Sequence, residues 1–241
     1  MKVVQNKVQV SGQVAVMAIN ALLARIIFDK NPDHAFYIEE SFPLDWMYPR
    51  LAPHGMILKI HRQPLREMSE EMVRKDRDYW RPLVAEMIGN WLDEDTSVRI
   101  VAEFVEKVYV ANDLDGFRGD PRFIRNQHPR KLFSKLRASI AGVYAWRYEN
   151  PVGEGGESGE AGNHAERSRM LREADFAFRQ AFAICPTSPE SLFRYVKLLV
   201  DAGRLEDAII IAGVALKVEP GNEQVQNLLA ELNRQSASST E

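Results

Sequence analysis

The chain has 241 residues, 45% of them hydrophobic, and carries a formal net charge of −3 at pH 7. This length is enough to bury a hydrophobic core, in one large or two small domains. The slightly acidic balance excludes a general attraction to nucleic acid or anionic lipid, so any basic binding site has to be local. Cys185 is the single cysteine, which excludes a disulfide within the chain.

Residues 1–66 are predicted to form a small α+β cap. The N-terminus lacks an apolar signal segment, and the apolar stretch Val14–Phe28 is too short to span a bilayer, so we expect a soluble chain as given. That stretch is predicted to be a helix with one apolar face, and strands are predicted over Ala35–Glu39 and Met56–Ile60. An aromatic and proline-rich loop, residues 40–49, follows the first strand. The apolar face of the helix comprises Val14, Met17, Ala18, Ala21, Leu22, Ile26 and Ile27.

Residues 67–149 are predicted to be helical. Ser69 and Thr96 are expected to cap two of the helices, and Pro129 fits the first turn of a third. Pro82 is expected to kink the first helix. The side chains expected to face the core are Met72, Tyr79 and Val84 in the first helix, Val98, Val101, Phe104, Val105, Val108 and Tyr109 in the second, and Leu132, Phe133, Leu136, Ile140, Val143 and Tyr144 in the third.

A basic run with interleaved aromatic residues lies within this helical part. It contains Arg118, Arg122, Arg125, Arg130, Lys131, Lys135 and Arg137, with Phe117, Phe123 and Phe133 among them. One interpretation is a site that binds phosphate or an acidic partner. We favour the other, a solvated helix face whose aromatic side chains turn inward, because charged runs on helices usually face water.

A repeat occupies residues 164–235, after a flexible, acidic, glycine-rich loop predicted at residues 150–163. A period near 34 residues, with small residues on one helix face and a proline after it, resembles the tetratricopeptide repeat. The resemblance implies stacked helical hairpins that bind proteins, with residues 132–148 as the first helix, and a tail over residues 236–241 is predicted to be disordered. The repeated positions are Ala174, Phe178, Ala181 and Pro186, which return as Ala208, Ala212, Ala215 and Pro220, 34 residues later (220 − 186).

Five residues of the second hairpin take the positions that line the concave groove in tetratricopeptide proteins. An aromatic anchor with a charged rim suits a protein or peptide partner. The alternative is that these helices only dock onto the N-terminal half of the chain. The five residues are Glu190, Phe193, Lys197, Val200 and Asp201.

No catalytic or metal-binding motif is recognisable. Glu39 and Glu40 point to opposite faces of a strand, and His34, His54 and His61 lack the spacing of a metal site. We therefore expect no catalytic residue, no metal and no cofactor. The residues suited to contact with a glycan or an acceptor are Glu39, Glu40, Asp45, Trp46 and Tyr48.

The segment Ala35–Pro49, continuing through His54–Ile60, resembles the C-terminal region of a family of bacterial membrane proteins. This is the DUF2723 family, whose members are similar to protein O-mannosyltransferase-type glycosyltransferases and often end in tetratricopeptide repeats. The resemblance covers Val8–Tyr148 and implies a soluble domain that accompanies a membrane glycosyltransferase or an envelope component, on the extracytoplasmic side. It carries over no catalytic residue, because the membrane-embedded part of the family has no counterpart in this sequence.

The sequence thus predicts a mainly α protein, with an α+β N-terminal cap, a helical middle and a C-terminal array of tetratricopeptide-like hairpins. We expect a non-catalytic module that binds a protein, and no binding of nucleic acid. The alternative is an accessory glycan- or acceptor-binding domain of a glycosyltransferase. Burial distinguishes them: packed Trp46 and Tyr48 side chains indicate a structural loop, whereas an open cleft shared with Asp45 indicates a glycan site.

Overall fold

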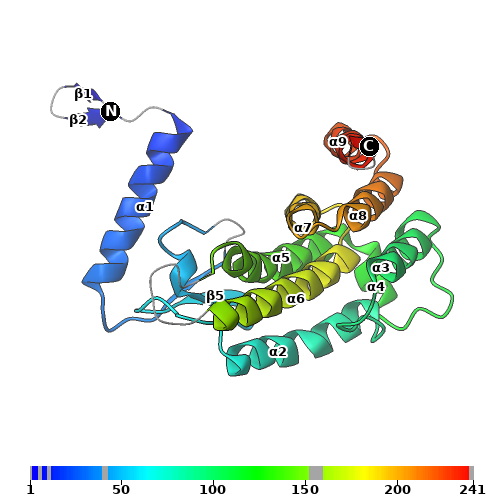
Figure 1. Cartoon of the computed structure of the whole chain (residues 1–241), viewed down its shortest axis with the longest axis horizontal. Helices are drawn as coiled ribbons and strands as arrows, with labels where there is room; N and C mark the ends of the chain where they lie inside the picture. The colour runs from blue at the N-terminus through cyan, green and yellow to red at the C-terminus, as the bar shows by residue number, and fades with distance from the viewer. Residues whose placement is uncertain (1, 5–6, 10–11, 40–42, 152–159, 239–241) are drawn as a thin grey trace.

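The computed structural model describes residues 2–4, 7–9, 12–39, 43–151 and 160–238 (Figure 1). Helices dominate it, which confirms the predicted mainly α fold with a small sheet near the N-terminus. After α1 (Gln13–Lys30), the helical elements are η1 (Tyr48–Arg50), α2 (Glu70–Ile88), α3 (Val98–Val105), η2 (Glu106–Val110), α4 (Pro121–Arg125), α5 (Gln127–Glu149), α6 (Glu160–Ile184), α7 (Pro189–Asp201), α8 (Leu205–Val218) and α9 (Glu223–Ser238).

Two small sheets lie in the N-terminal part. The antiparallel strands β1 (Lys2–Val4) and β2 (Lys7–Gln9) pair at the far end of α1 (Figure 1). The second sheet is antiparallel with the order β3 (Phe36–Ile38), β5 (Ile57–Ile60), β4 (Leu51–His54). Of its strands, β4 was not predicted, because Pro53 interrupts its pattern. Since β4 lies at the edge of the sheet, a residue without an N–H is tolerated there.

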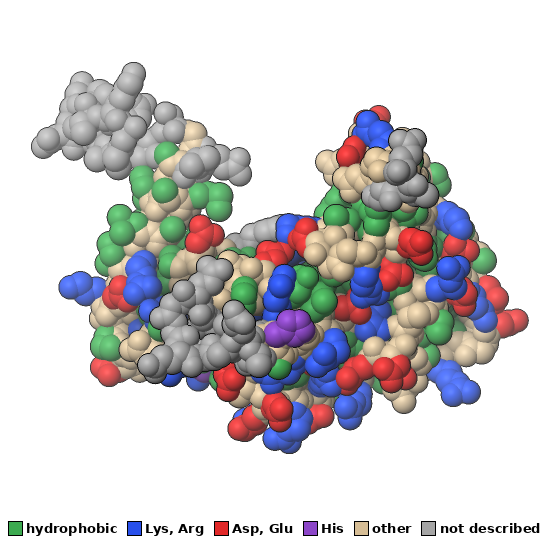
Figure 2. All heavy atoms as spheres, viewed as in Figure 1, with side chains coloured by type: hydrophobic (Ala, Val, Ile, Leu, Met, Phe, Trp, Pro, Cys, Tyr) green, Lys and Arg blue, Asp and Glu red, His purple; other side chains and the backbone are tan. Residues whose placement is uncertain are grey.

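The α1 helix projects from the body of the molecule, and its apolar side chains remain exposed (Figure 2). The predicted helix therefore forms, and Met17, Leu22, Ile26 and Ile27 of its apolar face are exposed. Its C-terminal end is held by Phe28, which is buried and whose ring centroid lies 5.3 Å from those of Phe36 and Trp46. Arg62 Nη1 donates to the Phe28 carbonyl at 2.6 Å. The exposed apolar residues of α1 are Val16, Met17, Leu22, Leu23, Ile26 and Ile27.

The start of α2 was predicted correctly, since the Ser69 side chain accepts a hydrogen bond from the Met72 N–H. The inward face of α2 differs by one residue from the prediction. Tyr79 is exposed, whereas Trp80 is fully buried. The helix runs through Pro82 and ends at Gly89, whose φ of 93° suits glycine.

The sequence predicted Thr96 as the N-cap of α3, but in the structure the N-cap is Ser97. Ser97 Oγ accepts from the Ile100 N–H at 3.3 Å. Thr96 is buried one residue earlier, where its hydroxyl donates to Asp93 Oδ1 at 2.7 Å and closes the turn before the helix. Either hydroxyl fits the N-cap pattern in the sequence, and the tertiary position of the turn decides between them.

A buried ion pair joins the helical middle to the repeats. Arg137 Nη1 on α5 contacts both carboxylate oxygens of Asp76 on α2, at 3.0 and 2.9 Å, and both side chains are 1% exposed. Arg137 Nε donates to Gln180 on α6 at 2.8 Å, and the Tyr144 hydroxyl donates to Asp76 at 3.1 Å. The interpretation of the basic run as a solvated face is therefore wrong for Arg137, which ties three helices together.

The chain after α4 forms two helical hairpins, α5–α6 and α7–α8, followed by α9. As predicted, α5 serves as the first helix of the first hairpin, and α5 and α6 pack along each other. Small residues allow this close approach, because Ala138 and Ala141 on α5 and Ala177 and Ala181 on α6 are fully buried. The predicted loop at residues 150–163 lies largely outside the described residues, and α6 begins within its range at Glu160.

Candidate functional site

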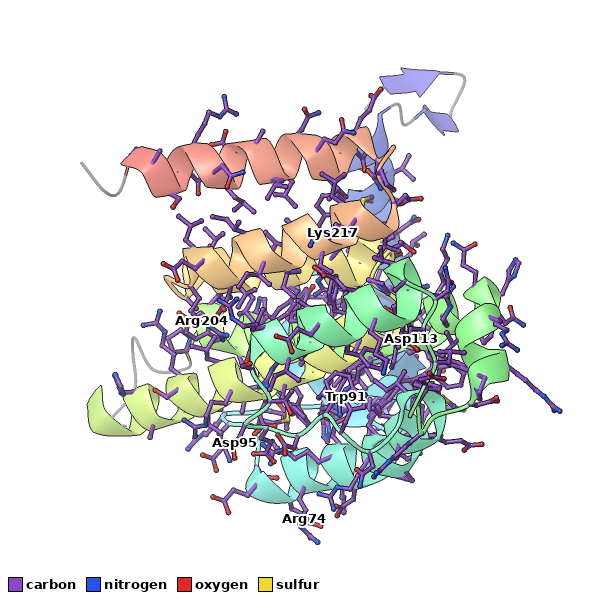
Figure 3. All side chains as sticks on the ribbon, turned by 90° about the vertical axis from the view of Figure 1, so that its right-hand side faces the viewer. Arg74, Trp91, Asp95, Asp113, Arg204 and Lys217 are labelled. Carbon is purple, nitrogen blue, oxygen red and sulfur yellow. The ribbon has the colours of Figure 1, made fainter. Side chains whose placement is uncertain are left out.

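The second helices of the two hairpins are covered by the helical middle. On α6, Glu173 receives hydrogen bonds from Arg77 of α2 at 2.8 and 2.5 Å. On α8, Lys217 pairs with Glu106 of η2, and Figure 3 shows it on the side of α8 next to α3 and η2. The side of the array that α6 and α8 form is therefore occupied within the chain. On the opposite side, β4 and β5 pack against α5, whereas the outward face of α7 is not covered in this way.

The outward face of α7 carries the five residues that the repeat pattern assigned to the groove. Glu190, Phe193 and Val200 are half-buried, and Lys197 and Asp201 are exposed. The remaining residues from Ser191 to Leu199, apart from Arg194, are buried against α6 and α8. The pattern therefore separates the face of α7 that packs from the face that remains available.

An ion-pair network fixes one end of this face. Lys197 Nζ lies 2.5 Å from Glu149 Oε1, at the end of α5, and 2.5 Å from Asp201 Oδ2, one turn further along α7. Partial burial opposes the charge of Lys197, but the two carboxylates more than offset it, so the pKa of Lys197 is raised. The α5 and α7 helices thus form one continuous surface at this point.

Arg194 is a residue of this surface that the sequence analysis missed. Its guanidinium lies over Gly142 of α5, where an added Cβ would come within 1.6 Å of Arg194 Nη2. Burial lowers the pKa of Arg194, although Tyr48, Glu149 and Glu190 lie near enough to oppose that shift. The sequence gives little indication of this contact, because no local pattern shows that a glycine inside α5 leaves space for an arginine of α7.

The helix α9, at the place of the terminal capping helix that the repeat pattern predicts, follows α7 at the repeat spacing. Its buried residues Val225 and Leu232 come 34 residues after the buried Ser191 and Leu198 of α7 (225 − 191 and 232 − 198). The helix packs against α8, and its remaining face is largely exposed. The exposed surface therefore extends from the Glu149 end of α5 over α7 toward α9, and α5, α7 and α9 follow in this order in Figure 1.

The predicted glycan-contact residues pack against different elements. Trp46 packs on Phe28 at the end of α1, whereas Tyr48 stacks on Trp146 of α5 with ring centroids 5.4 Å apart. Glu39 pairs with Lys135 at 3.0 Å, Asp45 is exposed, and Glu40 lies outside the described residues. Packed aromatic side chains favour a structural role for this loop, and glycan contact stays a prediction.

Within the described part of the chain, no cluster of three histidine, cysteine, aspartate or glutamate side chains is arranged to hold a metal ion. The buried acids there serve structural pairs. Asp175 on α6 accepts a hydrogen bond from the Tyr195 hydroxyl at 2.7 Å and pairs with Arg179 at 3.0 Å and Arg204 at 3.1 Å. No described helix is long and apolar enough to cross a membrane.

Comparison with known proteins agrees with the repeat geometry. Residues 167–232 match the family model of the tetratricopeptide repeat. No curated protein and no solved structure matches the chain. The match concerns α6 to α9 alone, so the resemblance of Val8–Tyr148 to the DUF2723 family stays a prediction. Repeats of this kind bind protein partners and are typically non-catalytic, and residues 167–232 are therefore similar to a protein–protein interaction module.

Proposed function

We propose that this chain is a non-catalytic interaction module that holds a peptide segment of a partner protein on the surface formed by α7, α9 and the Glu149 end of α5. The observation that carries the proposal is the selective exposure on α7. Phe193 remains half-buried between the charged Glu190 and Lys197, and Val200 between Lys197 and Asp201, while the opposite side of the helix is buried. An apolar anchor within a charged rim is the usual composition of a peptide-binding surface.

We further propose that the module is the soluble domain of a glycosyltransferase-like membrane protein, and that its partner is a membrane glycosyltransferase or an envelope component. The support is the resemblance of the segment Ala35–Pro49. That segment contains β3 and leads through η1 into β4, which packs against α2 and α5. The region of resemblance and the first hairpin thus belong to one packed body, as expected if they function together.

A site-specific photo-crosslinking experiment tests this proposal. A photoreactive phenylalanine analogue replaces Phe193 in one sample and Ile100 in the other. Ile100 is 47% exposed on α3, outside the proposed surface. We expect a crosslink to a protein of the membrane fraction from position 193 only. Equal crosslinking from both positions, or from position 100 alone, would contradict binding on this surface.

A further inference from the structure

A cavity lies at the opposite end of α5, away from the Glu149–Lys197 contact. Its volume is about 520 Å³, and it is bounded by η2, α4, the start of α5 and the end of α8. Lys217 and Asp113, both labelled in Figure 3, are the chain neighbours of the lining residues Val218 and Leu114. This volume is within the range of sites that bind small molecules or several side chains of a peptide.

The wall of the cavity belongs to a strongly basic stretch of an otherwise acidic chain. Between residues 118 and 131 the single carboxylate is Asp120, which accepts a hydrogen bond from the Arg122 N–H at 2.8 Å and so caps α4. None of the ion pairs between described residues includes a cation of this stretch. The cations are Arg118, Arg122, Arg125, Arg130 and Lys131, all exposed except the half-buried Arg130.

Arg130 is held at the wall of the cavity. Its guanidinium lies 4.9 Å from the centroid of the Tyr109 ring, and its Nε donates to the Asn126 carbonyl at 3.4 Å. Tyr109 is itself fixed, since its hydroxyl lies 2.9 Å from the carbonyls of Ala183 and Ile184, to which it donates. A positioned arginine loses less freedom on binding an anion than a freely moving one.

We propose that this cavity binds an acidic segment of a protein partner, with carboxylates at Arg125 and Arg130 and an apolar side chain of the same segment between Leu114 and Val218. Arginine forms charge-assisted hydrogen bonds with carboxylates. The lining also contains Ile124 and the carboxylate of Glu219. A compact phosphate would leave the apolar wall unused, so a peptide that offers both carboxylates and an apolar side chain fits better.

The test measures binding of a fluorescein-labelled peptide of aspartate, glutamate and leucine to the full chain by fluorescence polarisation. We expect Arg125→Gln to weaken binding about tenfold, the effect of losing one charge-assisted hydrogen bond. The matched control is Arg122→Gln, exposed on the same helix but outside the cavity, with an expected change of about twofold or less.

Two further variants separate this site from misfolding and from the α7 surface. Glu219→Gln is expected to strengthen binding of the acidic peptide, a gain that misfolding does not produce. Phe193→Ala is expected to leave it unchanged, which separates this site from the α7 surface.

Four results would overturn the proposal. The first is equal weakening by Arg122→Gln and Arg125→Gln, which indicates a diffuse basic surface. The second is equal binding of a peptide in which asparagine and glutamine replace the acids. The third is no binding of the acidic peptide. The fourth is displacement of the peptide by inorganic phosphate at concentrations as low as those of unlabelled peptide, which indicates a phosphate site.

Discussion

Replacing Asp76 with alanine is expected to lower the free energy of unfolding by about 3–5 kcal/mol, the usual cost of removing one partner of a buried ion pair. The loss is expected because the former partners of Asp76 remain buried. Arg137 would stay buried with its charge uncompensated, and the Tyr144 hydroxyl would lose its acceptor. The measurement is equilibrium unfolding in urea, followed by circular dichroism.

The control is Asp78→Ala, because Asp78 lies on the same helix with 54% of its side chain exposed and only a 3.9 Å contact to Arg81. We expect it to change stability by less than about 0.5 kcal/mol. The double variant Asp76→Ala/Arg137→Met removes both charges and is expected to be more stable than Asp76→Ala alone. A double variant that is no more stable than Asp76→Ala would contradict the assignment of the loss to an unpaired Arg137.

Replacing Phe178 with alanine is expected to cost about 3–5 kcal/mol, the range observed for large aromatic side chains in a core. Phe178 on α6 is fully buried and stacks on Tyr195 of α7, with ring centroids 5.7 Å apart. This contact joins the first hairpin to the second, so its loss should loosen the array as well as leave a cavity. Thermal and urea unfolding of the variant give the magnitude.

Leu132→Ala is the matched control for Phe178→Ala, since it also truncates a large apolar side chain, but one that is 50% exposed on α5. A change within about 0.5 kcal/mol is expected, as for most surface substitutions. Similar losses in the two variants would show that the hairpins do not pack through the Phe178 ring. Hydrogen exchange then reports whether α7 and α8 are selectively deprotected in Phe178→Ala.

The repeat period predicted the array well because its signal is local and repeats along the chain. Alanines such as Ala174 and Ala208 are needed where two helices approach closely, and both are fully buried. The same period separated the outward residues of α7 from the buried ones. Whether those outward residues bind a partner is a different question, and it stays a prediction that only an interaction measurement answers.

The predictions that failed depend on contacts between segments that are distant in the sequence, which a local pattern does not reveal. Arg137 has the same local sequence context as its solvated neighbours, and its partner Asp76 lies 61 residues earlier. Tyr79 was predicted to face the core, but Trp80 does so instead, because the helices that pack against α2 set its orientation. Exposure depends on tertiary contacts too: the apolar face of α1 formed as predicted, and whether Leu22 on it is covered depends on the rest of the chain, which leaves it exposed.

The central claim is that a partner segment binds across α7, and its most direct test is an affinity measured by calorimetry. The ligand is the partner peptide identified by crosslinking from position 193. We predict that Phe193→Ala weakens its binding about thirtyfold, as expected for an aromatic anchor worth about 2 kcal/mol, while Arg125→Gln leaves it unchanged. An unchanged affinity in a folded Phe193→Ala variant would contradict the claim.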